Sequence, residues 1–182
     1  IWGQAKISGD TNGKVWSISV PNNTTTGTSV DRSLLISDSG VPSLTSGDTN
    51  IIIGSASSDY SLTSGDSNII LGYNSGISIT SGSENILIGE NAGYNLDEGS
   101  GNICLGTDAG SSLTSAYENI FIGYEAGYDT TTGESNIFMG YSAGNRNTTG
   151  ESNIFMGYSA GYRNTTGESN IFMGYSAGNR NT

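Results

Sequence analysis

The sequence predicts an all-β fold, a parallel β-solenoid or β-roll, and three observations lead to this prediction. A unit that begins "NIxxG" recurs with a period of seventeen residues. That period is too short for a pair of helices, because helical solenoid repeats run to about 33 residues or more. Each unit holds one short run of β-branched and other apolar residues, while Gly, Ser, Thr and Asn dominate the rest. One short strand plus turns per unit, stacked coil on coil, fits all three observations.

The repeat divides the chain into three parts. Residues 1–32 do not follow the period, and we expect them to form an N-terminal cap or connector. Residues 33–49 resemble a degenerate lead-in copy, and residues 50–182 form an array of eight copies. The copies align on Asn50, Asn68, Asn85, Asn102, Asn119, Asn136, Asn153 and Asn170. Coils in register rise about 4.8 Å each, so the array predicts a rod of roughly 38 Å.

The strand of each copy is apolar at three consecutive positions. The first and third positions share one face of a strand, so we expect them to fill the coil interior as a core ladder: Ile137, Met139, Ile154, Met156, Ile171 and Met173. The middle position points to the other face and is also apolar, as in strands that are buried on both faces. We therefore expect an oligomer interface along the middle column: Phe121, Phe138, Phe155 and Phe172.

Polar and glycine columns accompany the strand. Three columns of Gly recur in the array and are expected at corners or at places of close chain approach. The column of Asn before each strand is expected to bond its side-chain amides from coil to coil. In the last three copies this Asn ladder comprises Asn136, Asn153 and Asn170.

The stretch "NIFMGYSAG…TTGES" resembles the "NIFIGYxAG"-type repeats of tail-fibre-domain proteins of phages and bacteria. More loosely, it is similar to the head repeats of trimeric autotransporter adhesins. The resemblance covers residues 50–182 and implies a homotrimeric fibre of intertwined or side-by-side chains, displayed on a cell surface or virion. It also implies a shaft or head segment that serves attachment, with a cell-surface glycan or host receptor as partner.

Composition excludes several other classes of protein. The net charge of −11 argues against binding to nucleic acid, whose phosphates require clustered Lys and Arg. No stretch approaches the length of a membrane span, so we expect no membrane insertion in this segment. The sequence has no His and no G-x-S-x-G motif, and we expect no enzyme and no catalytic residue. Cys104 replaces an aliphatic residue of the repeat and is expected to be a buried hydrophobe.

Three further groups of residues are candidates for binding or modification. Asp48 and Asp66 are weak candidates for calcium, although the calcium-binding nonapeptide repeat is absent and no other metal or cofactor is expected. A row of Tyr offers possible contacts with a glycan: Tyr141, Tyr158 and Tyr175. Asn147 and Asn164 begin "NTT" sequons that could carry glycans. The alternative to a fibre is a monomeric β-solenoid that binds a repetitive surface, either ice or a polysaccharide.

Overall fold

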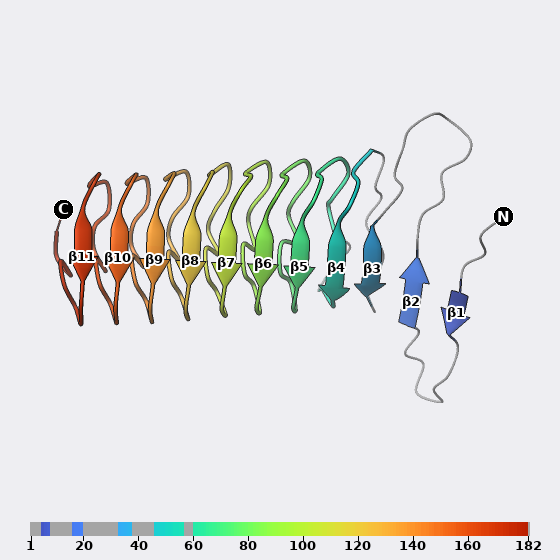
Figure 1. Cartoon of the computed structure of the whole chain (residues 1–182), viewed down its shortest axis with the longest axis horizontal. Helices are drawn as coiled ribbons and strands as arrows, with labels where there is room; N and C mark the ends of the chain where they lie inside the picture. The colour runs from blue at the N-terminus through green and yellow to red at the C-terminus, as the bar shows by residue number, and fades with distance from the viewer. Residues whose placement is uncertain (1–4, 8–15, 20–32, 38–45, 57–59, 182) are drawn as a thin grey trace.

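A computed structural model describes residues 5–7, 16–19, 33–37, 46–56 and 60–181 of the chain. The strands in these residues form one sheet in which the spatial order follows the order in the sequence. Figure 1 shows them side by side along the long axis of the molecule. The strands are β1 (Ala5–Ile7), β2 (Trp16–Ser19), β3 (Leu34–Ser37), β4 (Ile51–Gly54), β5 (Ile69–Leu71), β6 (Ile86–Ile88), β7 (Ile103–Leu105), β8 (Ile120–Ile122), β9 (Ile137–Met139), β10 (Ile154–Met156) and β11 (Ile171–Met173).

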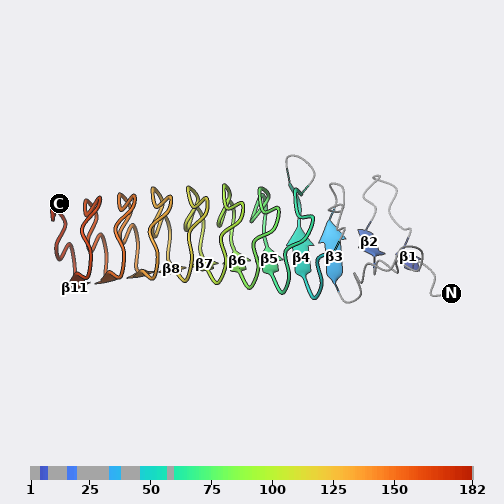
Figure 2. The same ribbon diagram turned by 90° about the horizontal axis from the view of Figure 1, so that it is seen from above.

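The strands from β3 to β11 are parallel, and each lies in register with the equivalent residues of the next copy. In Figure 2 the chain returns after each strand to start the next coil, which gives the stack of a β-solenoid. The fold class that the period predicts, an all-β parallel β-solenoid, is therefore confirmed. No described residue lies in a helix, and the described part of the chain has no helical segment that could span a membrane.

The sheet continues past the array toward the N-terminus. Strand β3 pairs in parallel with β4 and aligns Leu35 with Ile52, so the lead-in stretch does supply a repeat-like strand. The next two pairings, β2 with β3 and β1 with β2, are antiparallel. Within residues 1–32 only β1 and β2 are described, so the prediction of a cap or connector otherwise lies outside the described residues.

The two faces of the repeat strands are the reverse of those predicted. The middle column points into the coil, and Phe121, Phe138 and Phe155 are 0% exposed there. Phe172, in the last coil, is partly buried against the same core. The first and third positions face outward: Ile137, Met139, Ile154 and Met156 are half-buried, while Ile171 and Met173 are exposed. The phenylalanines therefore form no surface for a second chain, and the predicted interior ladder lies on the outside.

The reversal has a simple physical cause in the alternation of strand side chains. Asn136 is buried, and Phe138 lies two residues further on, so both side chains point to the same side. The intervening Ile137 must then point away from the core. An inward Asn ladder and an inward Ile ladder at adjacent positions are incompatible, and the hydrogen-bonded Asn ladder takes the interior.

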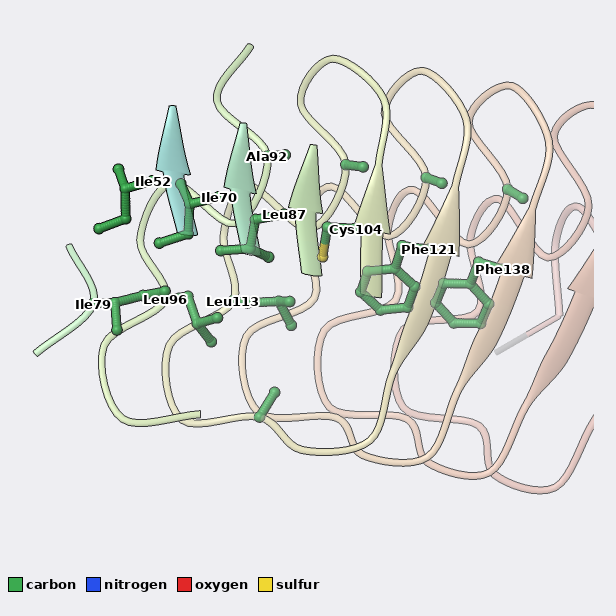
Figure 3. Packing of buried hydrophobic residues seen from close by; sticks show 14 of the residues in the cluster. Ile52, Ile70, Ile79, Leu87, Ala92, Leu96, Cys104, Leu113, Phe121 and Phe138 are labelled. Carbon is green, nitrogen blue, oxygen red and sulfur yellow. The ribbon is translucent and has the colours of Figure 1, made fainter. Parts of the chain in front are cut away.

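The core contains a second column, which we call the facing column; it lies nine residues after the middle position of the strand, or ten in the first coil, where Leu62 follows Ile52. Figure 3 shows Ile79, Leu96 and Leu113 of this column across from the strand residues Ile70, Leu87 and Cys104. The side chains of Ile70 and Ile79 converge beside Gly76, since a Cβ there would lie 3.1 Å from each. The two columns therefore fill one interior between them.

Along the rod, the side chains of the facing column become smaller where those of the middle strand column become larger. Where the strand carries Ile, Leu or Cys, the facing residue is a buried aliphatic: Leu62, Ile79, Leu96 or Leu113. Where the strand carries Phe, the facing residue is smaller and polar: Thr130, Asn147, Asn164 or Asn181. Close packing explains this exchange, because one cross-section has room for one large side chain and not for two. The change of filling falls between Cys104 and Phe121.

Glycine is required at two corners for two different reasons. At Gly140, φ is 135° and a Cβ would lie 2.5 Å from the carbonyl oxygen of Gly157 in the next coil. At Gly144, φ is 59° and a Cβ would overlap the ring of Phe138. The first column lets successive backbones approach closely, and the second makes room for the core aromatic residue.

Candidate functional site

The predicted Asn ladder is present and buried. Nδ2 of Asn136 donates to Oδ1 of Asn119 at 3.1 Å and to the carbonyl oxygen of Gly150 at 2.8 Å. Its own Oδ1 accepts from both the backbone N and the Nδ2 of Asn153, and Asn170 repeats this pattern on Asn153. Every polar atom of an interior Asn is thus satisfied within the rod, so the ladder holds coils together and offers nothing to a ligand.

A second, shorter row of Asn lies in the facing column and bears on the sequons. Asn147 and Asn164 are both 0% exposed. Nδ2 of Asn147 donates to the carbonyl oxygen of Gly150 at 3.0 Å, and Nδ2 of Asn164 donates to Oδ1 of Asn147 at 3.2 Å. A glycan needs that nitrogen at the surface. The prediction that Asn147 and Asn164 could carry glycans is therefore wrong for the folded chain.

The outward side of the sheet is a candidate interaction surface, which we call the outer face. It is formed by the first and third strand positions: Ile51, Ile53, Ile69, Leu71, Ile86, Ile88, Ile103, Leu105, Ile120, Ile122, Ile137, Met139, Ile154, Met156, Ile171 and Met173. All sixteen are aliphatic or Met, and none is fully buried. Ile51, Ile53 and Ile88 are each 37% exposed. A monomer in water rarely presents so long an apolar strip.

Tyrosines border the outer face in the C-terminal half of the rod. The rings of Tyr124, Tyr141, Tyr158 and Tyr175 stack on one another with centroids 5.0–5.2 Å apart. Tyr141 and Tyr158 are each 48% exposed and have a neighbouring ring on both faces. A sugar therefore cannot stack on the faces of these two rings. The hydroxyl edge of the row remains accessible, and contact there stays a prediction.

Glu125 affects the first tyrosine of this row. The hydrogen bond and negative charge of Glu125 raise the pKa of Tyr124 above its ordinary value. Oε2 of Glu125 also accepts from the hydroxyl of Ser142 at 3.2 Å and from Nδ2 of Asn145 at 3.2 Å. This carboxylate therefore serves to join neighbouring coils.

Two threonine hydroxyls of the turns, those of Thr131 and Thr148, are used within the rod, whereas Thr132, Thr149 and Thr166 are exposed. Oγ1 of Thr131 donates to the carbonyl oxygen of Thr148 at 3.2 Å, and Oγ1 of Thr148 donates to that of Thr165 at 2.9 Å. Hydroxyls that point along the rod to the next backbone are not free to match a lattice of ice. The column of Thr132, Thr149 and Thr166 stays exposed, so ice binding, one alternative to a fibre, remains a prediction.

The weak calcium candidates lie in the first coils. Oδ1 of Asp66 accepts from the backbone N of Asp48 at 2.7 Å, and Oδ1 of Asp48 accepts from the backbone N of Thr49 at 2.7 Å. Carboxylates used in this way stabilise turns. Among the described residues, no group of three or more acidic, Cys or His side chains is arranged to hold a metal ion. The described residues thus give no support to a calcium site at Asp48 and Asp66, which stays a prediction.

Cys104 is fully buried in the middle column, as its place in the repeat predicts. Burial raises the pKa of its thiol to about 12, because the thiolate would lose its hydration. A neutral, inaccessible thiol neither attacks a substrate nor binds a metal readily. Cys104 is a packing residue of the coil.

Sequence reasoning missed both the outward direction of the Ile and Met columns and the role of the facing column. Strict alternation from the Asn ladder was the signal that could have assigned the faces. In the aligned copies, Leu at the middle strand position goes with Leu at the facing position, whereas Phe goes with Asn. This paired exchange could have revealed the facing column.

Comparisons with known protein families, with curated proteins and with solved structures give no significant match.

Proposed function

We propose that this chain is a structural segment, either a shaft or a head, of an extracellular fibre on a cell surface or virion. Three copies of the chain form the fibre, which serves attachment and not catalysis. The observation that carries the proposal is the outer face, an uncharged apolar strip that runs along all eight coils. The resemblance of the "NIFMGYSAG" repeats to tail-fibre and adhesin repeats supplies the number three and the attachment role.

The geometry of the outer face suits association between copies of the chain. Its side chains recur at the coil rise of about 4.8 Å, and an identical chain placed alongside has the same period. Eight matched coils give a contact roughly 38 Å long. Covering this strip removes half-exposed Ile, Leu and Met side chains from water, which is favourable in proportion to the apolar area buried. Because each chain carries a net charge of −11, salt should assist assembly by screening repulsion.

The mass of the protein in solution tests the proposal directly. A trimer of the 18.8 kDa chain is expected at micromolar concentration in light scattering coupled to size exclusion. The double variant Ile137→Glu and Ile154→Glu, which puts two charges on the outer face, is expected to dissociate it. A matched control, Thr149→Glu and Thr166→Glu, adds the same charge at turn positions and should leave the mass unchanged. A stable monomer of the unmodified chain would remove the proposal.

The alternative, a monomeric solenoid that binds ice or a polysaccharide, is less well supported. Thr131 and Thr148 donate their hydroxyls within the rod, and the tyrosine row covers its own ring faces. Of the threonine pairs, the exposed column of Thr132, Thr149 and Thr166 is what such a surface would contact. A monomer in solution that shows thermal hysteresis would instead favour this alternative.

A further inference from the structure

Charge is distributed very unevenly along the rod. Residues 33–145 contain thirteen Asp and Glu and no Lys or Arg at all. Residues 146–182 contain three Arg against two Glu, so this end carries a small positive charge. The three cations are Arg146, Arg163 and Arg180, which occupy the same position in successive copies. Residues 33–182 are acidic apart from these three successive copies, whose cations form a distinct electrostatic site.

The fold places these three arginines in a straight row. The backbone N of Arg146 donates to the carbonyl oxygen of Tyr162 at 2.9 Å, and that of Arg163 donates to Asn179 at 3.1 Å. These bonds hold the turns in register, so the Arg positions recur at the coil rise of about 4.8 Å. All three side chains are exposed. The guanidinium carbon of Arg146 lies 5.6 Å from the centre of the Tyr162 ring, which orients that side chain along the row.

The row lies on the side of the rod away from the outer face. Asn147, the residue after Arg146, belongs to the facing column and is buried across the core from the strand. Figure 3 shows that column, at its aliphatic members, lying opposite the strands. Arg146 is exposed where its neighbour is buried, so its side chain leaves the rod on the far side. Association of copies through the outer face would therefore leave the arginines accessible.

The arginines are not neutralised within the described chain. Among the described residues, no carboxylate forms an ion pair with these three guanidinium groups, and the one ring contact that they make is that of Arg146 with Tyr162. Three like charges at neighbouring coils repel one another unless an anion lies across them. Guanidinium groups bind carboxylate and sulfate groups through two parallel hydrogen bonds. The row is thus suited to an extended ligand whose acidic groups recur along its length.

We infer that the Arg146–Arg163–Arg180 row binds an acidic polysaccharide, one that carries carboxylate or sulfate groups. This inference deepens the proposed attachment role and rests on it. A flexible polysaccharide can engage three coils and then leave the surface. Nucleic acid is disfavoured because residues 33–145 carry no Lys or Arg, so the coils that precede the row repel a phosphate backbone. The ligand class follows from the recurring arginines and from the acidic coils before them.

Binding of defined probes tests the inference. We would measure the affinity of the full chain for a heparin hexasaccharide, a galacturonate hexamer, uncharged maltohexaose and a single-stranded oligonucleotide. Binding of either acidic sugar, weakened by added salt, is expected, with none for maltohexaose. Replacing all three arginines by Gln should weaken it about tenfold, since each exposed charge pair contributes modestly. Arg→Lys at the three sites should give an intermediate loss, because the ammonium group lacks the planar fork.

A matched control separates the row from net charge. Ser135→Glu, Ser152→Glu and Ser169→Glu lower the net charge by three, as the Gln variant does, at a position where other coils already carry Glu84 and Glu118. This control should retain most of the binding. Equal loss in both variants would overturn the inference, as would binding of the oligonucleotide alone. Solution mass, measured on every variant, reports separately on the fibre proposal, so either proposal can fail by itself.

Discussion

The exchange between the middle and facing columns predicts a strong coupling between Phe121 and Thr130. These two residues form the first coil of the aromatic type, next to the aliphatic filling of Cys104 and Leu113. Replacing Phe121 by Leu and Thr130 by Leu together would recreate the pair Leu87 and Leu96 found two coils earlier. The double variant should therefore be much more stable than the sum of the single effects indicates.

The magnitudes follow from the packing of each side chain. Phe121→Leu leaves a cavity and removes one stacked pair, since its ring lies 4.9 Å from that of Phe138. We expect a loss of about 2 kcal/mol. Thr130→Leu alone crowds the intact Phe121, which costs about 1–3 kcal/mol. Part of this is offset because Thr130 Oγ1 is buried without a hydrogen-bond partner, so we expect a net loss of about 1 kcal/mol.

In the double variant the added Leu fills the space that the lost ring leaves. We expect a net loss of about 1 kcal/mol rather than the additive value of about 3 kcal/mol, so the coupling is about 2 kcal/mol. Equilibrium unfolding in urea for all four proteins measures this cycle. For a chain of this size each kcal/mol corresponds to about 2–4 °C in melting temperature. Thermal melts provide an independent check.

A distant pair supplies the control for this cycle. Leu62→Met conserves volume in a facing-column position that lies several coils from Phe121. Its combination with Phe121→Leu should be additive within about 0.5 kcal/mol. Additivity of the Phe121–Thr130 pair as well would refute the view that the two columns share one volume.

Four further outcomes are expected. Thr130→Val should raise the free energy of unfolding by about 1 kcal/mol, because it removes the buried hydroxyl that has no partner; a clear loss of stability in urea would contradict this. Gly140→Ala should lower the melting temperature far more than Gly174→Ala, since both positions have positive φ but only the first places a Cβ against the next backbone. Asn119→Ala should cost about 3 kcal/mol or more, because it leaves buried partners on both neighbouring coils unbonded; a neutral effect in urea unfolding would argue against the ladder. Burial raises the pKa of Cys104 to about 12, so the thiol binds its proton more tightly in the folded chain, and the free energy of unfolding should fall as pH rises from about 9 toward 12. Thiol reagents at pH 8 should label Cys104 only as fast as the chain opens.

The period made the fold predictable from the sequence. A seventeen-residue unit with a single apolar run leaves little choice but one strand and its turns, and strict recurrence fixes the register of each coil on the next. The Asn ladder was predictable for the same reason, since identical amides at identical heights can bond to one another. These features depend only on recurrence, which a single sequence displays fully.

The direction of each column was harder to predict, because all three strand positions are apolar. The two columns of Ile, Leu and Met at the first and third strand positions suit an interior better, by sequence, than the middle column, which mixes Ile and Leu with Cys104 and Phe121. Tertiary context decided the matter: the buried Asn136 sets the inward side, and Gly144 opens the space that Phe138 occupies. The burial of the sequon residue Asn147 was equally invisible to a reading of its local motif.

The function depends on surfaces, and the sequence predicted those less well. The apolar run of the strand indicated apolar side chains on both faces of the sheet, and it is the Ile and Met columns that lie outside; that another chain covers them stays a prediction. The arginine row was visible as a recurring residue. Its position on the far side of the rod became clear only from the burial of its neighbour.

The first coil of the array shows how such a rod can change without losing its order. Asn50 and Asn68 are separated by eighteen residues rather than seventeen, yet Nδ2 of Asn68 still donates to Oδ1 of Asn50 at 3.0 Å. Strands β4 and β5 also keep the common register. The added residue of this coil therefore leaves the register of the next coil unchanged. Evolution can thus lengthen the rod by whole units, in steps of about 4.8 Å, and independently enlarge a single turn to present a new loop at a chosen height.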